Sequence, residues 1–189
     1  LWMVQAHEER RDATARLLKE HRIQQTADQL HNTLVIMEAE MRGMALAELS
    51  RPLASAAETA RHGASTRRDL NRLLDRGSQA THQLIAALAD LVQENPDQVG
   101  RVRRLEDLAD RRLVLLRRMV SESARPERQG RMASLVLQGD SIMSWFRREL
   151  AEFRRAEERL MEYQTLELRG EENSSLVVLW VGVALALLG

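Results

Sequence analysis

Glu38 and Arg42 offer the most specific pairing chemistry in this sequence. The acid precedes the base by four residues in a stretch with helical composition. This order and spacing place the two side chains on one helix face, where an exposed pair is worth about 0.2–0.5 kcal/mol. The spacing therefore predicts an ion pair between them.

Glu157 is a carboxylate on an apolar helix face. It follows Phe153 by four residues and precedes Leu160 by three, so it falls on the same apolar seam. A buried carboxylate needs a cation or hydrogen-bond donors to offset its lost hydration. Arg42 is the preferred partner and Arg147 the alternative. We expect either an interhelical clamp that fixes register or part of a ligand pocket or signalling switch.

Bulky aromatic side chains are concentrated late in a chain with only 3% aromatic residues. Trp145 lies one position off the apolar seam and would stand close to Arg42 if the first and last helices are neighbours. An apolar plate beside an arginine and a carboxylate suits a planar, hydrogen-bonding small molecule. The sequence therefore suggests a ligand site formed by Arg42, Trp145, Arg147 and Glu157.

Other chemistry finds little support. The five histidines never lie three or four residues apart, so no helix face offers a metal-binding pair. The absence of cysteine excludes disulfides and thiolate catalysis. With 28 acidic and 28 basic residues the chain has no net field to attract nucleic acid. We expect no catalytic residues, no cofactor and no metal here.

The elements that position these residues are helical. Only 3 prolines and 9 glycines interrupt a sequence rich in Leu, Ala, Arg and Glu, which is typical of helices. Helices are predicted over residues 5–49, from residue 66 to the reversal at Asn95, over 97–123 and from 140 onward. Arg51-Pro52 is predicted to end the first helix, residues 53–65 form a connector or short irregular helix, and the stretch between Gly130 and Gly139 stays open. Asn95 is the predicted N-cap of the third helix, with Pro96 at its first position.

Each predicted helix carries apolar residues at spacings of three and four, as on the buried face of a bundle helix. The seams are Ile23, Ala27, Leu30, Leu34, Met37, Met41 and Met44; Leu70, Leu73, Gly77, Ala80, Leu84, Leu88 and Leu91; Val102, Leu105, Leu108, Leu115, Leu116 and Met119; and Ile142, Phe146, Leu150, Phe153, Leu160 and Tyr163. The prediction is an all-α, up-down-up-down four-helix bundle with long first and fourth helices continuing toward a membrane.

Residues 176–189 contain no charged side chain. Fourteen helical residues rise about 21 Å, whereas a bilayer core needs about 20 residues. We expect them to begin a truncated transmembrane helix of a longer protein. Four antiparallel helices bring both ends of the chain to one end of the bundle, so residues 1–4 would close an earlier span. The expected divisions are a membrane-proximal stalk (1–22), the sensory bundle (23–172) and the membrane segment (173–189).

Two sequence patterns resemble the third class of CHASE sensory domains. In that family a Glu precedes an Arg-Gly pair by four residues, as Glu38, Arg42 and Gly43 do. The family's last-helix pattern is matched by Met143, Phe146-Arg147, Leu150, Phe153, Glu157 and Leu160-Met161. The chain departs from the family at Met44, where an aromatic residue is usual, and at Gln164, where an arginine is expected.

The resemblance implies an extracytoplasmic input domain of a transmembrane sensor histidine kinase in a bacterial inner membrane, on the periplasmic side. Such a domain would form a homodimer and pass its signal through shifts of the first and fourth helices. The stimulus would be physical or a small molecule, and the wider CHASE class allows a cytokinin-like adenine derivative. Two alternatives remain: the input domain of a membrane cyclase or chemoreceptor, and a tail-anchored helical scaffold.

Overall fold

A computed structural model describes the backbone of residues 2–49, 56–123 and 129–188, and the side chains of residues 11, 14–43, 63–122 and 132–162. Its elements are α1 (Trp2–Leu49), α2 (Ala56–Leu91), α3 (Pro96–Ser123) and α4 (Gln129–Leu188). The described residues contain no strand. The predicted all-α four-helix bundle is confirmed.

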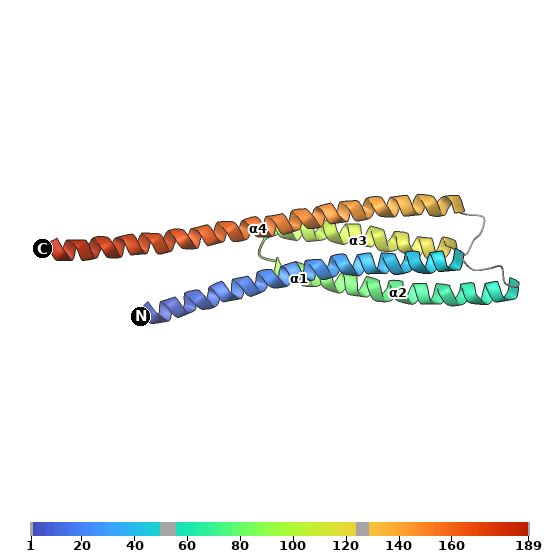
Figure 1. Cartoon of the computed structure of the whole chain (residues 1–189), viewed down its shortest axis with the longest axis horizontal. Helices are drawn as coiled ribbons and strands as arrows, with labels where there is room; N and C mark the ends of the chain where they lie inside the picture. The colour runs from blue at the N-terminus through green and yellow to red at the C-terminus, as the bar shows by residue number, and fades with distance from the viewer. Residues whose placement is uncertain (1, 50–55, 124–128, 189) are drawn as a thin grey trace. The chain divides into compact units, whose positions relative to one another are not determined.

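The chain divides into two compact units, Leu1–Ala151 and Glu152–Gly189. In the first unit α1, α2, α3 and the first part of α4 lie side by side (Figure 1). The second unit is the remainder of α4.

Two helices extend beyond their predicted parts. α2 begins at Ala56 rather than residue 66, so most of the segment predicted as a connector or short irregular helix belongs to it. α4 begins at Gln129, so the stretch between Gly130 and Gly139, which the sequence left open, is helical. A glycine costs a helix interior only about 1 kcal/mol relative to alanine, which packing can outweigh. Pro52, the predicted breaker between α1 and α2, lies outside the described residues.

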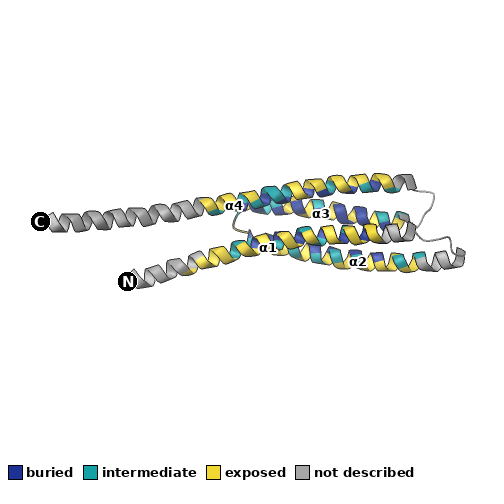
Figure 2. Ribbon diagram, viewed as in Figure 1, coloured by how far each residue is buried: buried dark blue, intermediate teal, exposed yellow. Residues whose placement is uncertain are grey.

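The core face of α1 follows the predicted seam. Its side chains point into the bundle at every described position, from Ile23 through Leu30 and Leu34 to Met41. Figure 2 shows this buried stripe along the helix. The side chain of Met44 is outside the described residues.

The core face of α2 lies one residue beyond most of the predicted positions. Leu70 and Leu88 are buried as predicted. The remaining buried positions are Leu74, Ser78, Thr81, Ile85 and Val92. The prediction failed because it favoured apolar residues, whereas two polar residues face the core. The Thr81 hydroxyl is satisfied by donating to the Gly77 carbonyl at 2.8 Å.

The predicted seams of α3 and α4 are correct in part. Val102, Leu105, Leu115 and Leu116 of α3 are buried, whereas Leu108 and Met119 are half-buried. In α4 the buried side chains include Phe146, Leu150 and Phe153. Ile142 is half-buried, Leu160 is exposed, and the side chain of Tyr163 lies outside the described residues.

Polar contacts define the end of the bundle at which α2 turns into α3. Asn95 caps α3 as predicted, since its side-chain oxygen accepts the Gln98 amide at 3.3 Å. Lys19 of α1 pairs with Glu94 beside this turn at 2.7 Å. On α4, Glu149 accepts from Arg104 of early α3 at 2.9 Å. Within the first unit, α1 therefore enters and α4 leaves at this same end, as an even number of alternating helices requires.

α1 and α4 are also the longest helices, with 48 and 60 residues. α4 stays helical through residues 176–188. No helix in the described part of the chain has a stretch long and apolar enough to cross a bilayer.

Candidate functional site

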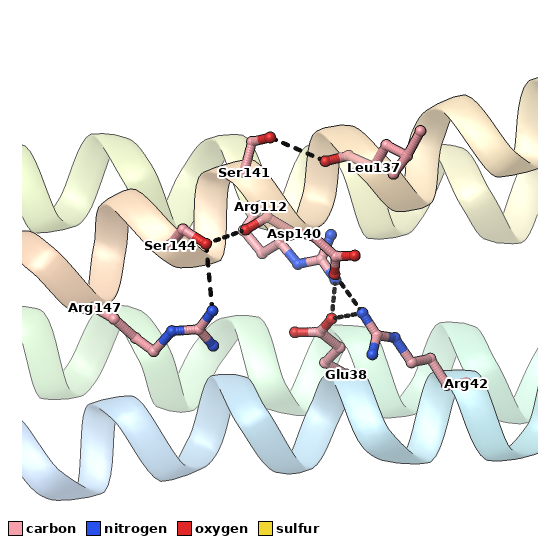
Figure 3. Close-up of polar contacts among 8 residues, drawn as sticks. All are labelled: Glu38, Arg42, Arg112, Leu137, Asp140, Ser141, Ser144 and Arg147. Atoms are coloured by element: carbon pink, nitrogen blue, oxygen red, sulfur yellow. Dashed lines mark hydrogen bonds and ion pairs between the residues drawn. The ribbon is translucent and has the colours of Figure 1, made fainter.

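Glu38 is the centre of a cluster of four charged side chains. Its carboxylate accepts from Arg42, one turn along α1, at 2.5 Å and from Arg112 of α3 at 2.9 Å. Figure 3 shows both guanidinium groups turned toward this carboxylate. The pair with Arg42 is the one that their spacing predicts, and Arg112 makes Glu38 a bridge between α1 and α3.

Asp140 extends the cluster to α4. Its carboxylate accepts from the same Arg42 guanidinium at 2.6 Å. The four side chains carry two positive and two negative charges, so the cluster is neutral as a whole. Arg42 thereby links α1 directly to α4 (Figure 3).

Arg112 is the most deeply buried charge of the cluster. Its side chain is 3% exposed and that of Glu38 is 12% exposed. Burial lowers the pKa of the Arg112 guanidinium, and the negative charge of Glu38 counteracts this. Two of its nitrogens, Nε and Nη1, have no hydrogen-bond partner among the described residues. Glu38 therefore provides the compensation that a buried cation requires.

Gly139 makes the space that Arg112 occupies. A Cβ atom built on this glycine would stand 1.7 Å from Nη1 of Arg112. The backbone of α4 can therefore approach the guanidinium only because position 139 has no side chain. This close approach explains why a buried glycine lies inside α4.

The remaining predicted site residues lie around this cluster or apart from it. Arg147 donates to the Ser144 hydroxyl at 3.4 Å on α4 (Figure 3). Trp145 is 51% exposed and lies about 140° around the helix from Asp140, the residue that meets Arg42. Glu157 is buried but belongs to the second unit. Its pairing with Arg42 or Arg147 therefore stays a prediction.

A family model for the CHASE3 domain matches residues 72–167. The match spans half of the chain. This chain belongs to the CHASE3 family. CHASE3 domains are extracytoplasmic sensory domains of signalling proteins. No curated protein and no solved structure matched the chain.

The family match covers α3 and parts of α2 and α4. Arg112, Gly139 and Asp140 lie within it, as does the second predicted pattern beginning at Met143. The first pattern, with Glu38, lies ahead of the matched residues. The resemblance drawn from sequence is therefore confirmed, and its last-helix pattern lies within the matched residues.

Sequence reasoning missed three residues of this CHASE3 domain's cluster: Arg112, Gly139 and Asp140. A signal for Arg112 was present, because it stands three residues after Ala109 and four before Leu116, both buried. A charge at this seam spacing predicts a buried ion pair in the same way that Glu157 was read. Gly139 and Asp140 lie where the sequence leaves the start of the fourth helix open.

The described residues offer this CHASE3 domain no metal cluster. A depression along α1, lined by residues that include Gln25, Asp28 and Gln29, is open to solvent and formed by one helix. The chemistry of the cluster is therefore that of ion pairs that link α1 to α3 and α4.

Proposed function

We propose that this CHASE3 domain is the input domain of a transmembrane sensor histidine kinase and relays its stimulus by shifting α4 relative to α1. The observation that carries the proposal is the ion pair between Arg42 and Asp140. It joins the two helices that meet the same end of the bundle within the first unit.

The two halves of the cluster differ in a way that suits a relay. Glu38 and Arg112 are almost fully buried, so separating them strands a charge in the protein interior. Arg42 and Asp140 are 48% and 53% exposed, and water can replace either partner at small cost. A fixed contact between α1 and α3 beside an exchangeable contact to α4 favours movement of α4. Helix shifts in such transitions are about 1–2 Å.

The apolar composition of residues 176–189 supports a membrane at the end of α4. In this proposal the bundle lies on the periplasmic side of a bacterial inner membrane. A displacement of α4 would then pass directly into its membrane segment.

A small molecule that engages Arg42, Trp145 or Arg147 is our proposal for the stimulus, and a cytokinin-like adenine derivative has suitable planar chemistry. Calorimetry with Trp145→Ala and Arg42→Ala tests it. Unchanged affinity in both variants would place the ligand elsewhere.

The direct experiment uses the full-length protein in membrane vesicles. Incubation with labelled ATP should give acid-labile phosphate on histidine, and both Arg42→Met and Asp140→Asn should change its level relative to wild type. Glu40→Gln is the matched control, because Glu40 is an exposed acid on the same helix. Cyclic-nucleotide synthesis instead of phosphohistidine would indicate a cyclase. Normal kinase output in both cluster variants would contradict the relay.

A further inference from the structure

The outward face of α1 is almost free of charge. Between residues 17 and 39 it exposes twelve side chains, of which only Arg22 and Asp28 are acidic or basic residues: Leu17, Leu18, His21, Arg22, Gln24, Gln25, Asp28, Gln29, Asn32, Val35, Ile36 and Ala39. In a chain with 30% charged residues this is an unusual surface.

The uncharged side chains form a straight row. Leu18, Gln25, Asn32, Ile36 and Gly43 recur at spacings of seven, seven, four and seven, which places them within about 20° of one line on the helix. The row lies opposite the core seam and extends over about 38 Å of helix. Arg22, Asp28 and Glu40 lie at its margins, each about 60° from the line.

Gly43 has no explanation among the residues whose side chains the structure describes. A Cβ atom built on it would meet none of them within 4 Å. A glycine at an exposed position inside a helix costs about 1 kcal/mol relative to alanine. Its absent side chain would permit the backbone of another helix to approach closely.

The outward face of α3 is the opposite case. Between residues 103 and 118 it exposes nine side chains, all charged except Val114: Arg103, Arg104, Glu106, Asp107, Asp110, Arg111, Val114, Arg117 and Arg118. This face is well suited to water. The lack of charge on α1 is therefore not shared by α3. The start of α4 is also poor in charge, since Asp140 is the only charged residue among those exposed between residues 133 and 145.

We infer that the row Leu18, Gln25, Asn32, Ile36 and Gly43 is the contact surface for a second copy of this chain. In a twofold dimer, residues near the axis meet their own copies, so any charge there would face a like charge. An uncharged row avoids that repulsion, and its amide side chains both donate and accept hydrogen bonds, so each can pair with its copy.

The inference that the two α1 helices run parallel rests on the proposed function. Two copies anchored in one membrane run parallel, so each residue of the row meets its own copy along the whole helix. In an antiparallel pair only residues near the axis do so.

The experiment uses the absence of cysteine in the chain. Single variants Leu18→Cys, Asn32→Cys and Ile36→Cys of the chain in detergent micelles are oxidised, with Val114→Cys as the exposed control on α3. We expect disulfide-linked dimers from all three α1 variants and only background from the control. Crosslinking at just one α1 position would still support this row as the contact surface. It would contradict the parallel arrangement of the two copies and therefore the membrane arrangement in the proposed function.

A second measurement tests the same contact without relying on disulfide formation. Ile36→Glu and Val114→Glu make the same kind of change at side chains that are 56% and 63% exposed. Sedimentation should show a dimer weakened by about tenfold or more in the first, because two like charges meet, and an unchanged dimer in the second. A monomeric wild-type chain, or equal effects of the two variants, would overturn the inference.

Discussion

α1 forms a buried ion pair with α3 and an exposed ion pair beside the α2–α3 turn. In the buried pair, Glu38 and Arg112 meet with side-chain exposures of 12% and 3%. Beside the turn, Lys19 and Glu94 meet at 2.7 Å with exposures of 43% and 78%. The distances are alike, so hydration makes the difference.

This difference indicates where α1 is held firmly. A buried pair resists separation because each partner would lose its compensation in a region of low polarity. An exposed pair exchanges with water almost without cost. α1 is therefore fixed at Glu38 and weakly held near Lys19, toward the end at which it enters the bundle.

The largest expected effect comes from removing Glu38. Glu38→Ala strands Arg112 without its carboxylate and should lower the free energy of unfolding by about 3–5 kcal/mol. Urea titration followed by circular dichroism measures this, with Glu40→Ala as the exposed control on α1. Equal losses in the two variants would show that the Glu38–Arg112 pair contributes no more to the free energy of unfolding than an exposed acid does.

Gly139→Ala should have the next largest effect. The added methyl group would displace the Arg112 guanidinium, and we expect a loss of about 1–3 kcal/mol. Gly100→Ala is the matched control, since its Cβ would have its nearest neighbour at 3.8 Å and should gain stability from helix propensity. Placing Gly139→Ala in an Arg112→Met background should abolish the loss. Persistence of the loss there would show that the α4 backbone, rather than Arg112, requires the glycine.

Asp140→Asn should alter stability by less than about 1 kcal/mol, because its pair with Arg42 is half-exposed. The same thermal or urea unfolding measurement checks it. A loss as large as that of Glu38→Ala would mean that the contact to α4 is as rigid as the contact to α3.

The smallest effect belongs to the pair beside the turn. The Lys19 hydrogen bond and charge lower the pKa of Glu94 from its ordinary value of 4.5. A carboxyl group whose pKa is lower in the folded state stabilises the fold fully at pH values above its unfolded-state pKa. This contribution disappears as the pH falls through its folded-state pKa. Glu94→Gln should therefore differ slightly from wild type at pH 6 and converge with it in acid. A difference that grows on acidification would contradict the pairing.

The sequence was sufficient for the elements whose patterns are purely apolar. Ile23 to Met41 formed an uninterrupted apolar seam, and Asn95-Pro96 marked the start of α3. Prediction failed where polar or small residues enter the interior. Ser78 and Thr81 shifted the core face of α2. The stretch up to Gly139 stayed ambiguous, because the sequence does not show that this glycine accommodates an arginine from another helix. Such fits depend on the neighbour, which a single helix pattern does not contain.

The candidate site was half predicted for the same reason. Glu38 and Arg42 belong to one helix, so their spacing indicates their pairing. Arg112 and Asp140 reach the same point from two other helices, and only the packing of the bundle brings them there.

A pair of double-mutant cycles tests the central claim most directly. One cycle combines Glu38→Ala with Arg112→Met and the other combines Lys19→Met with Glu94→Gln, all followed by urea unfolding of the same chain. The account predicts a coupling of about 2 kcal/mol or more for Glu38 and Arg112 and a coupling too small to measure for Lys19 and Glu94. Additive effects of Glu38→Ala and Arg112→Met would contradict it, because the two side chains would then not hold α1 to α3.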